Sequence, residues 1–225
     1  MYFRALGSRV VSVIAAIAAA VALVSGCSRS DDDDADPAPI ATNPIALDVT
    51  WAVKDDASSN QMLAFSDRIR ASSAALWQAT QGQMYLRTVL LKDKSVDGDV
   101  VLDNLTLKSA EGMFAYTILY TDGTWEIHMG GAYPMQSWIH ETGHAEVLQD
   151  WSLPEEYDLG NATCCAMGAY LIGSGDGLVL YCDEDNCVTS RDGCWQHVIL
   201  PLHTTWKYPA SFGSVPATNI TVQNN

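Results

Sequence analysis

The chain has 225 residues and a formal net charge of −15, because 27 Asp and Glu residues outnumber 12 Lys and Arg residues. Such a charge repels polyanions and therefore argues against binding to nucleic acid or to anionic lipid surfaces. Hydrophobic residues make up 48% of the chain, which contains no internal repeat. This length and composition predict one domain with a sizeable core.

The N-terminus has the pattern of a secretory signal. Arg4 and Arg9 precede an apolar run, Val10–Val24, which is short for a membrane span. The run ends in Leu23-Val24-Ser25-Gly26-Cys27, which resembles a bacterial lipobox. The resemblance implies that residues 1–26 are a signal peptide and that Cys27 carries the lipid that anchors the chain to a bacterial membrane. An ordinary signal peptide followed by an incidental cysteine is the alternative.

Residues 27–43 predict a lipidated cysteine followed by a solvated tether. The stretch is rich in Asp and Pro and has no aromatic residue, so it cannot bury enough apolar surface to offset its chain entropy. Calcium binding by the run Asp31–Asp34 is disfavoured, since four successive carboxylates repel one another. Ser28 after the cysteine resembles lipoproteins sorted to the outer membrane. We therefore expect an exported lipoprotein on the periplasmic or surface face of that membrane.

Residues 44–225 form the expected folded domain, which begins with a strand and a long helix. Leu47–Val53 alternates apolar and polar residues, as a half-buried strand does. Asn60–Thr80 carries apolar residues at three-, four- and seven-residue steps, which predicts an amphipathic helix that Gly82 closes.

Four further strands are predicted before the middle of the domain. Met84–Leu91, Val100–Leu107 and Met113–Tyr120 are rich in Val, Leu and Tyr and are flanked by turn residues. A short strand follows at Trp125–Met129. It is either an edge strand with which an extended peptide could pair or an ordinary interior strand.

The next segment, His140-Glu141-Thr142-Gly143-His144, is the most informative in the chain. Residues four apart share one face of a helix, so the His140 and His144 imidazoles can bind one Zn²⁺ ion. Glu141 would then be the general base that accepts a proton from the attacking water. A surface helix with two solvated histidines is the alternative.

The surroundings of this motif indicate a helix that begins near Pro134 and stops at Leu153-Pro154. One side would pack through Met135, Trp138, Ile139 and Thr142. The opposite side would present four polar side chains to a cleft: Ser137, His140, Glu141 and His144.

The third zinc ligand is ambiguous. Asp150 lies six residues after His144, but an unbroken helix would rotate it by about 240° away from that histidine. Glu155 follows the expected helix stop, where the chain can turn back. We favour Glu155 and keep Asp150 as the alternative; a solvated carboxylate is the other interpretation of either residue.

Cysteine content supports an oxidising location. With Cys27 assigned to lipid, the five disulfide candidates are Cys164, Cys165, Cys182, Cys187 and Cys194. Two disulfides and one free thiol are expected, although adjacent Cys164 and Cys165 are poorly placed to pair with each other. A zinc ribbon is the competing idea, but two Cys-x-x-Cys motifs are missing. Of the remaining histidines, His197 and His203 are expected to be structural or exposed.

Several segments together resemble a known family. They are His140-Glu141-Thr142-Gly143-His144, Leu153-Pro154-Glu155-Glu156-Tyr157, Cys164-Cys165-Ala166-Met167-Gly168, Cys182-Asp183-Glu184-Asp185-Asn186 and Cys194-Trp195. This pattern, within about residues 60–198, is similar to the metzincin-type catalytic domain of calcium-activated chloride channel regulators and related bacterial lipoproteins.

The resemblance implies His140 and His144 as zinc ligands, Glu141 as base and Glu155 in place of the family's aspartate ligand. It implies that Met167 is the methionine of the Met-turn, an apolar floor beneath the metal. The chain departs from the family in using Glu and in a gap after His144 that is longer by about one helical turn.

The leading expectation is a membrane-anchored zinc metallopeptidase that acts on proteins or peptides with one catalytic Zn²⁺. The rival is a catalytically silent lipoprotein that serves as a binding or envelope-assembly module. A zinc-storing protein is a third possibility, but it should show more histidine clustering. The expected fold is a monomeric α+β, metzincin-like domain with a mixed twisted sheet, a backing helix and the motif helix. A Cys-rich C-terminal subdomain follows from about residue 150.

Overall fold

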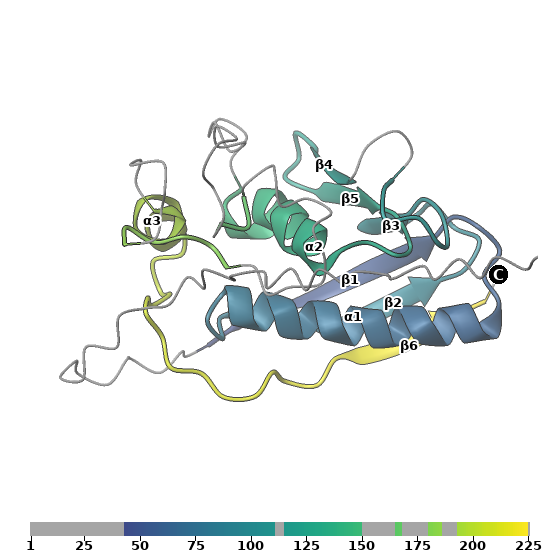
Figure 1. The fold of residues 1–225 in the computed structure, drawn as a ribbon, viewed down its shortest axis with the longest axis horizontal. Helices are drawn as coiled ribbons and strands as arrows, with labels where there is room; N and C mark the ends of the chain where they lie inside the picture. Colours follow the sequence, from purple (N-terminus) through teal and green to yellow (C-terminus); the bar gives the residue numbers. More distant parts are fainter. Residues whose placement is uncertain (1–42, 111–114, 150–164, 168–179, 186–192, 225) are drawn as a thin grey trace, which may run out of the picture. The chain divides into compact units, whose positions relative to one another are not determined.

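Six strands form one mixed sheet in the part of the chain that the structure describes. The computed structural model describes residues 43–110, 115–149, 165–167, 180–185 and 193–224 (Figure 1). The expected signal peptide, Cys27 and nearly all of the tether lie outside these residues. No helix within the described ranges has both the length and the apolar character that a membrane crossing requires.

The sheet mixes parallel and antiparallel pairs. Its strands are β1 (Ile45–Val53), β2 (Met84–Lys92), β3 (Val100–Leu102), β4 (Ala115–Leu119), β5 (Trp125–Met129) and β6 (Asn219–Gln223). They lie in the order β4-β5-β3-β1-β2-β6, and only the β4–β5 pair is antiparallel. Together with the helices, this sheet confirms the predicted α+β class.

The long helix α1 (Ser59–Ala79) forms where the apolar periodicity predicts it. A capping box begins the helix: the Ser58 hydroxyl accepts from the Gln61 amide, and the Gln61 side chain accepts from the Ser58 amide. Its apolar side is buried through Met62, Phe65, Ile69 and Leu76. After the helix, Gly82 has φ +79°, a backbone conformation that side-chain-bearing residues rarely adopt.

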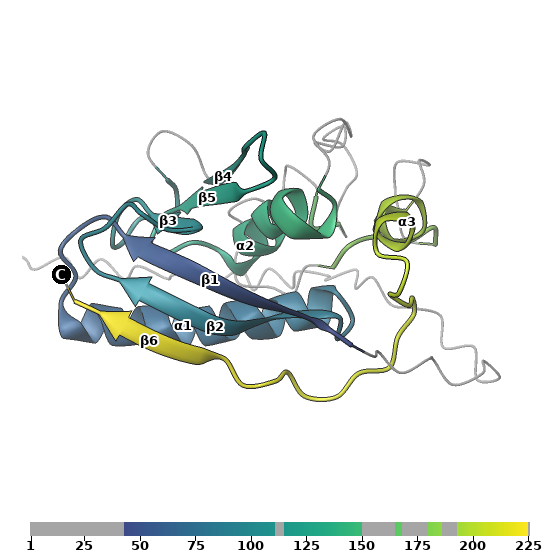
Figure 2. The same cartoon turned by 180° about the vertical axis from the view of Figure 1, so that it is seen from behind.

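Both main helices cover one face of the sheet. They lie in front of the strands in Figure 1 and behind them in Figure 2. Helix α2 (Met135–Thr142) packs on β1 through Trp138, whose ring centroid is 5.2 Å from that of Trp51. The Trp138 indole also donates to the Ser72 carbonyl of α1 at 3.0 Å. The fully buried Trp51 side chain therefore contacts the motif helix directly.

One strand prediction needs correction, one open alternative is decided and one strand was missed. β3 ends at Leu102 instead of Leu107, because Asn104 accepts from the Leu107 amide and donates to the Ser109 carbonyl in a local turn. For Trp125–Met129 the interior alternative holds: β5 lies between β3 and β4, so β4 is the edge strand on that side of the described sheet and β6 forms the other edge. β6 was not predicted; it pairs with β2 in parallel.

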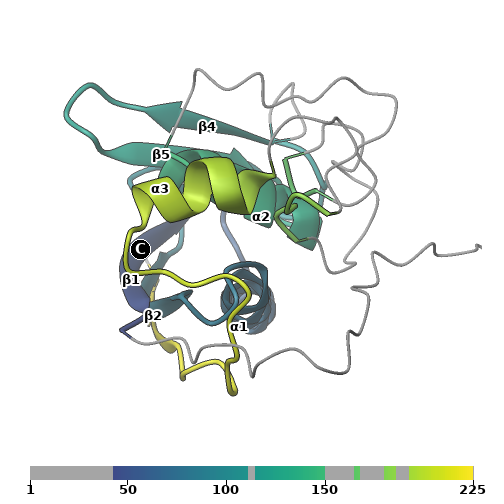
Figure 3. The ribbon, with the colours of Figure 1, turned by 90° about the vertical axis from the view of Figure 1, so that its left-hand side faces the viewer.

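The C-terminal helical segment lies beside the end of the motif helix. It consists of the short π-helical turn η3 (Trp195–Ile199) and α3 (Leu200–Leu202) (Figure 3). Just beyond it, the His203 ring nitrogen Nε2 lies 2.9 Å from the Val147 carbonyl and can donate to it. The His203 ring also stacks on Trp206, with ring centroids 4.0 Å apart. His203 is therefore structural, and His197 is an exposed partner of Glu184.

Candidate metal centre

The histidine motif spans the junction of an α-helix and a π-helical turn. α2 begins after Pro134, whose extended backbone serves as the N-cap. The turn η1 (Gly143–Val147) continues it, and the Leu148 amide donates to the Gly143 carbonyl five residues back. All residues from Gln136 to Thr142 are buried, Ser137 among them, whereas His144 is half-buried.

The two imidazoles face each other through the same ring atom. The Nε2 atoms of His140 and His144 lie 3.0 Å apart, with ring centroids separated by 4.7 Å. A tetrahedral zinc ion with Zn–N distances of about 2.0–2.1 Å would hold two nitrogens about 3.3 Å apart. The pair therefore fits a shared zinc ion with an adjustment of a few tenths of an ångström.

A backbone carbonyl fixes the first of these rings. His140 Nδ1 lies 3.0 Å from the Ala166 carbonyl oxygen. A carbonyl can only accept a hydrogen bond, so Nδ1 carries the ring proton and donates it. The lone pair of Nε2 is then available for a metal. Burial, reinforced by the neighbouring His144, lowers the pKa of His140 to about 4. At pH 7 this imidazole is consequently neutral, as a metal ligand must be.

Glu141 is held between the motif helix and the edge strand. Its side chain is 3% exposed, and Oε2 accepts a hydrogen bond from the Thr117 hydroxyl of β4 at 2.8 Å. The same hydroxyl lies 3.1 Å from the Glu141 carbonyl. The carboxylate thus has a fixed orientation in a site from which most solvent is excluded. The sequence analysis did not identify Thr117 as a site residue. The one feature that could have pointed to it is its hydroxyl group, in the middle of a predicted strand.

Met167 packs directly against the histidine segment. An added Cβ at Gly143 would lie 2.6 Å from the Met167 sulfur and 3.4 Å from the Tyr181 ring. Met167 is fully buried, and the Tyr181 hydroxyl donates to the Ile139 carbonyl at 2.9 Å. The chain therefore has an apolar layer beneath Gly143, at the position between the two histidines.

The helix ends before either candidate for the third ligand. The π-helical turn ends at Val147, Leu148 is its C-cap, and Gln149 then has φ +49°. The prediction that the helix stops at Leu153-Pro154 is therefore wrong. The helix does not continue unbroken to Asp150, so the rotation of about 240° no longer argues against that residue as a ligand. Asp150 and Glu155 both lie outside the described residues. Within those residues, no third His, Cys, Asp or Glu joins the two histidines at ligand distance.

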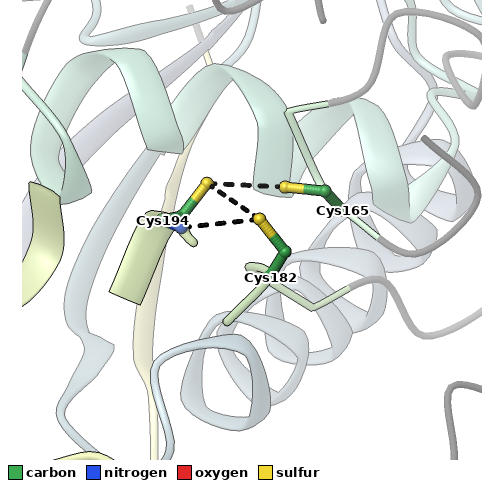
Figure 4. Close-up of side chains that lie close together, drawn as sticks. All are labelled: Cys165, Cys182 and Cys194. Carbon is green, nitrogen blue, oxygen red and sulfur yellow. Dashed lines mark hydrogen bonds between the residues drawn. The ribbon is translucent and has the colours of Figure 1, made fainter. Parts of the chain in front are cut away.

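Three cysteines gather in a second cluster, drawn in Figure 4. Cys165, Cys182 and Cys194 are each at most 4% exposed, and their sulfur atoms all lie within 4.8 Å of one another. Such a trio could hold a metal ion. The contact with Cys182, together with burial, raises the pKa of the Cys165 thiol to about 12. None of the three is in a disulfide; Cys164 and Cys187 lie outside the described residues.

Comparisons with known proteins add no assignment to this geometry. No family model, no curated protein and no solved structure matches the chain. The resemblance to metzincin domains therefore stays a prediction from the motifs.

The contact between Gly143 and Met167 predicts the effect of Gly143→Ala. The added methyl group should lower the free energy of unfolding by about 1–3 kcal/mol, because the buried sulfur must move. In chemical denaturation, Gly143→Ala combined with Met167→Ala should cost less than the two single changes together. Gly213→Ala is the control, since no atom lies near its added Cβ. Strictly additive costs would contradict the contact.

The lowered pKa of His140 predicts a pH-dependent stability of the metal-free protein. Between pH 6.5 and about 4 the folded protein binds fewer protons at this ring than the unfolded chain does, so acid favours unfolding. The free energy of unfolding should fall over this range by up to about 3 kcal/mol more than in His140→Gln. Denaturant unfolding at several pH values measures it. Equal losses in both proteins would show that His140 is not the cause.

Proposed function

We propose that the chain is a zinc-dependent metallopeptidase with His140 and His144 as two ligands and Glu141 as general base. The observation that carries the proposal is the pair of Nε2 atoms, 3.0 Å apart, next to a buried carboxylate. A neutral histidine pair fits Zn²⁺ in donor type and in spacing. A site that only stores metal would not need a carboxylate beside it.

The proposed chemistry divides the work between the metal and the protein. A bound zinc ion would supply Lewis acidity, which activates water and polarises a peptide carbonyl. Glu141 would accept the proton of the attacking water and pass it to the leaving amine. The Thr117 hydroxyl orients the carboxylate for this transfer, and the Ala166 carbonyl keeps the proton of His140 on Nδ1.

The edge strand supports a peptide as the substrate. β4 pairs with β5 on one side and has no strand on its other side among the described residues. Its Thr117 reaches Glu141, so the proposed base lies against this edge. An extended peptide that pairs with β4 would pass close to Glu141, which is the arrangement that hydrolysis requires. A mixed sheet is also part of the metzincin-like domain that we expected.

The remaining parts of the proposal rest on the sequence. Glu155 is the third ligand that the family resemblance implies, and Met167 would be the Met-turn residue. The early end of the helix makes Asp150 an equal alternative. Lipidation at Cys27 would anchor the enzyme to the bacterial outer membrane, and we propose that it acts there as a monomer.

One observation favours a second candidate, a silent lipoprotein that acts as a binding or envelope-assembly module. Glu141 is buried and hydrogen-bonded to Thr117, so its carboxylate could have a purely structural role, the attachment of the motif helix to β4. In that case the histidines could still bind zinc, but no substrate would be cleaved.

Replacement of Glu141 by Gln distinguishes the two candidates. Gln keeps the shape and can still accept from Thr117, but it cannot take a proton. Exported protein should bind zinc in both forms, and cleavage of an unbiased peptide library should fall by about 10²-fold or more in Glu141→Gln. Zinc without cleavage in either form would support the silent module. Cleavage that Glu141→Gln leaves unchanged would rule out the proposed mechanism.

Parallel alanine variants identify the third ligand. One of the two variants, Glu155→Ala or Asp150→Ala, should remove the ligand and weaken zinc binding by at least about 100-fold. Loss of an outer-shell contact already weakens binding by up to about 100-fold, and loss of a direct ligand should cost more. Competition with a chromophoric chelator measures this affinity. Glu156→Ala serves as the control for removal of a neighbouring acidic charge. If neither variant weakened binding, neither carboxylate would be the ligand.

A further inference from the structure

Three separate segments of the chain bring their thiols to one point. Cys165 comes just before Met167, Cys182 follows Tyr181, and Cys194 precedes η3. The Cys194 sulfur lies 3.5 Å from that of Cys165 and 3.5 Å from that of Cys182. In Figure 4 all three side chains point toward a common centre.

These distances do not describe a disulfide. A disulfide requires sulfur atoms about 2.05 Å apart, well short of the 3.5 Å seen here. Thiol–disulfide exchange through Cys194 would need the three sulfurs nearly in line. With two sides of 3.5 Å and a third of at most 4.8 Å, the angle at the Cys194 sulfur is no more than about 90°. The arrangement is a triangle and not a line.

A triangle of this size is what a metal ion with thiolate ligands needs. Zn–S bonds of about 2.3 Å in a tetrahedron place sulfurs about 3.8 Å apart. Two of the sulfur–sulfur distances differ from this value by a few tenths of an ångström, and the third, at most 4.8 Å, differs by no more than about 1 Å. The Cys194 amide also points at the Cys182 sulfur, at 3.4 Å, as amides do toward ligating thiolates in metal sites. Soft thiolates in a tetrahedral set favour zinc among common divalent ions.

We propose that Cys165, Cys182 and Cys194 bind a structural zinc ion, separate from the histidine site, with a fourth ligand from outside this trio. Binding would release the thiol protons and involves no oxidation. This assignment replaces the expected two disulfides, because only Cys164 and Cys187 remain once Cys27 and the trio are set aside.

Such an ion would connect the floor of the histidine site to the C-terminal segment. Cys165 is followed by Ala166, whose carbonyl orients His140. Tyr181, next to Cys182, bonds to the Ile139 carbonyl in the motif helix. The Trp195 amide, next to Cys194, donates to the Cys182 carbonyl at 3.1 Å. Each proposed ligand is thus one residue away from a contact that holds the motif helix or the tail.

Zinc content of the exported full chain tests the proposal. If both sites exist, the wild-type protein should contain about two zinc ions per chain, and Cys182→Ser should contain about one. The combined variant His140→Ala/His144→Ala should also contain about one. His197→Gln, which removes an exposed histidine near the cluster, is the control and should keep both.

The same measurement separates failure of this site from failure of the histidine site. The cysteine site would be overturned if the wild-type protein contained one zinc ion, Cys182→Ser still contained it and the histidine variant did not. The reverse pattern would uphold it and overturn the histidine site.

Alkylation of the wild-type protein gives a test that needs no variant to fold. The protein is denatured without reductant, in the presence of a chelator and an alkylating reagent. Mass spectrometry should then find all three thiols alkylated: those of Cys165, Cys182 and Cys194. A disulfide at any of the three would overturn the proposal.

Discussion

The hydrogen bond between the His140 ring and the Ala166 carbonyl is the contact on which the geometry of the site depends. It sets which nitrogen of a buried neutral ring carries the proton, and so directs the other nitrogen toward His144. It is also a contact between segments 26 residues apart, which joins the motif helix to the segment of Cys165 and Met167. The same hydrogen bond therefore orients the His140 ring and attaches the segment of Cys165 and Met167 to the motif helix.

The sheet supplies the other support for the motif helix. Trp51 on β1 contacts both Trp138 and Tyr133, with ring centroids 5.2 and 5.8 Å apart, and so fixes the start of α2 against the sheet. Thr117 on β4 then holds Glu141. The two histidines and the carboxylate are thus positioned from three sides: the central strand, the edge strand and the floor beneath Gly143. Side chains positioned in this way lose little freedom when a ligand binds.

Periodicity in the sequence was sufficient for β1, β2 and α1, because each buries one regular side. It missed β6, because Asn219–Gln223 alternates polar and apolar residues over only five positions and is mostly exposed. The helix end was misplaced because Gln149, with no glycine or proline to mark it, adopts a left-handed conformation. Motif spacing found both histidines and Glu141. It could not find the cysteine trio, since the three residues are 17 and 12 positions apart and meet only through the fold.

The π-helical turn Gly143–Val147 has a consequence for the chain that follows it. Each bond of such a turn encloses one residue more than a bond of an α-helix, so the turn is equivalent to a single inserted residue. The first histidine precedes this insertion and the second lies within it, while Leu148, the first residue after the turn, is rotated by about 100° relative to its place in a regular helix. The turn therefore acts as a rotational offset that sets the direction in which the chain leaves the histidine pair.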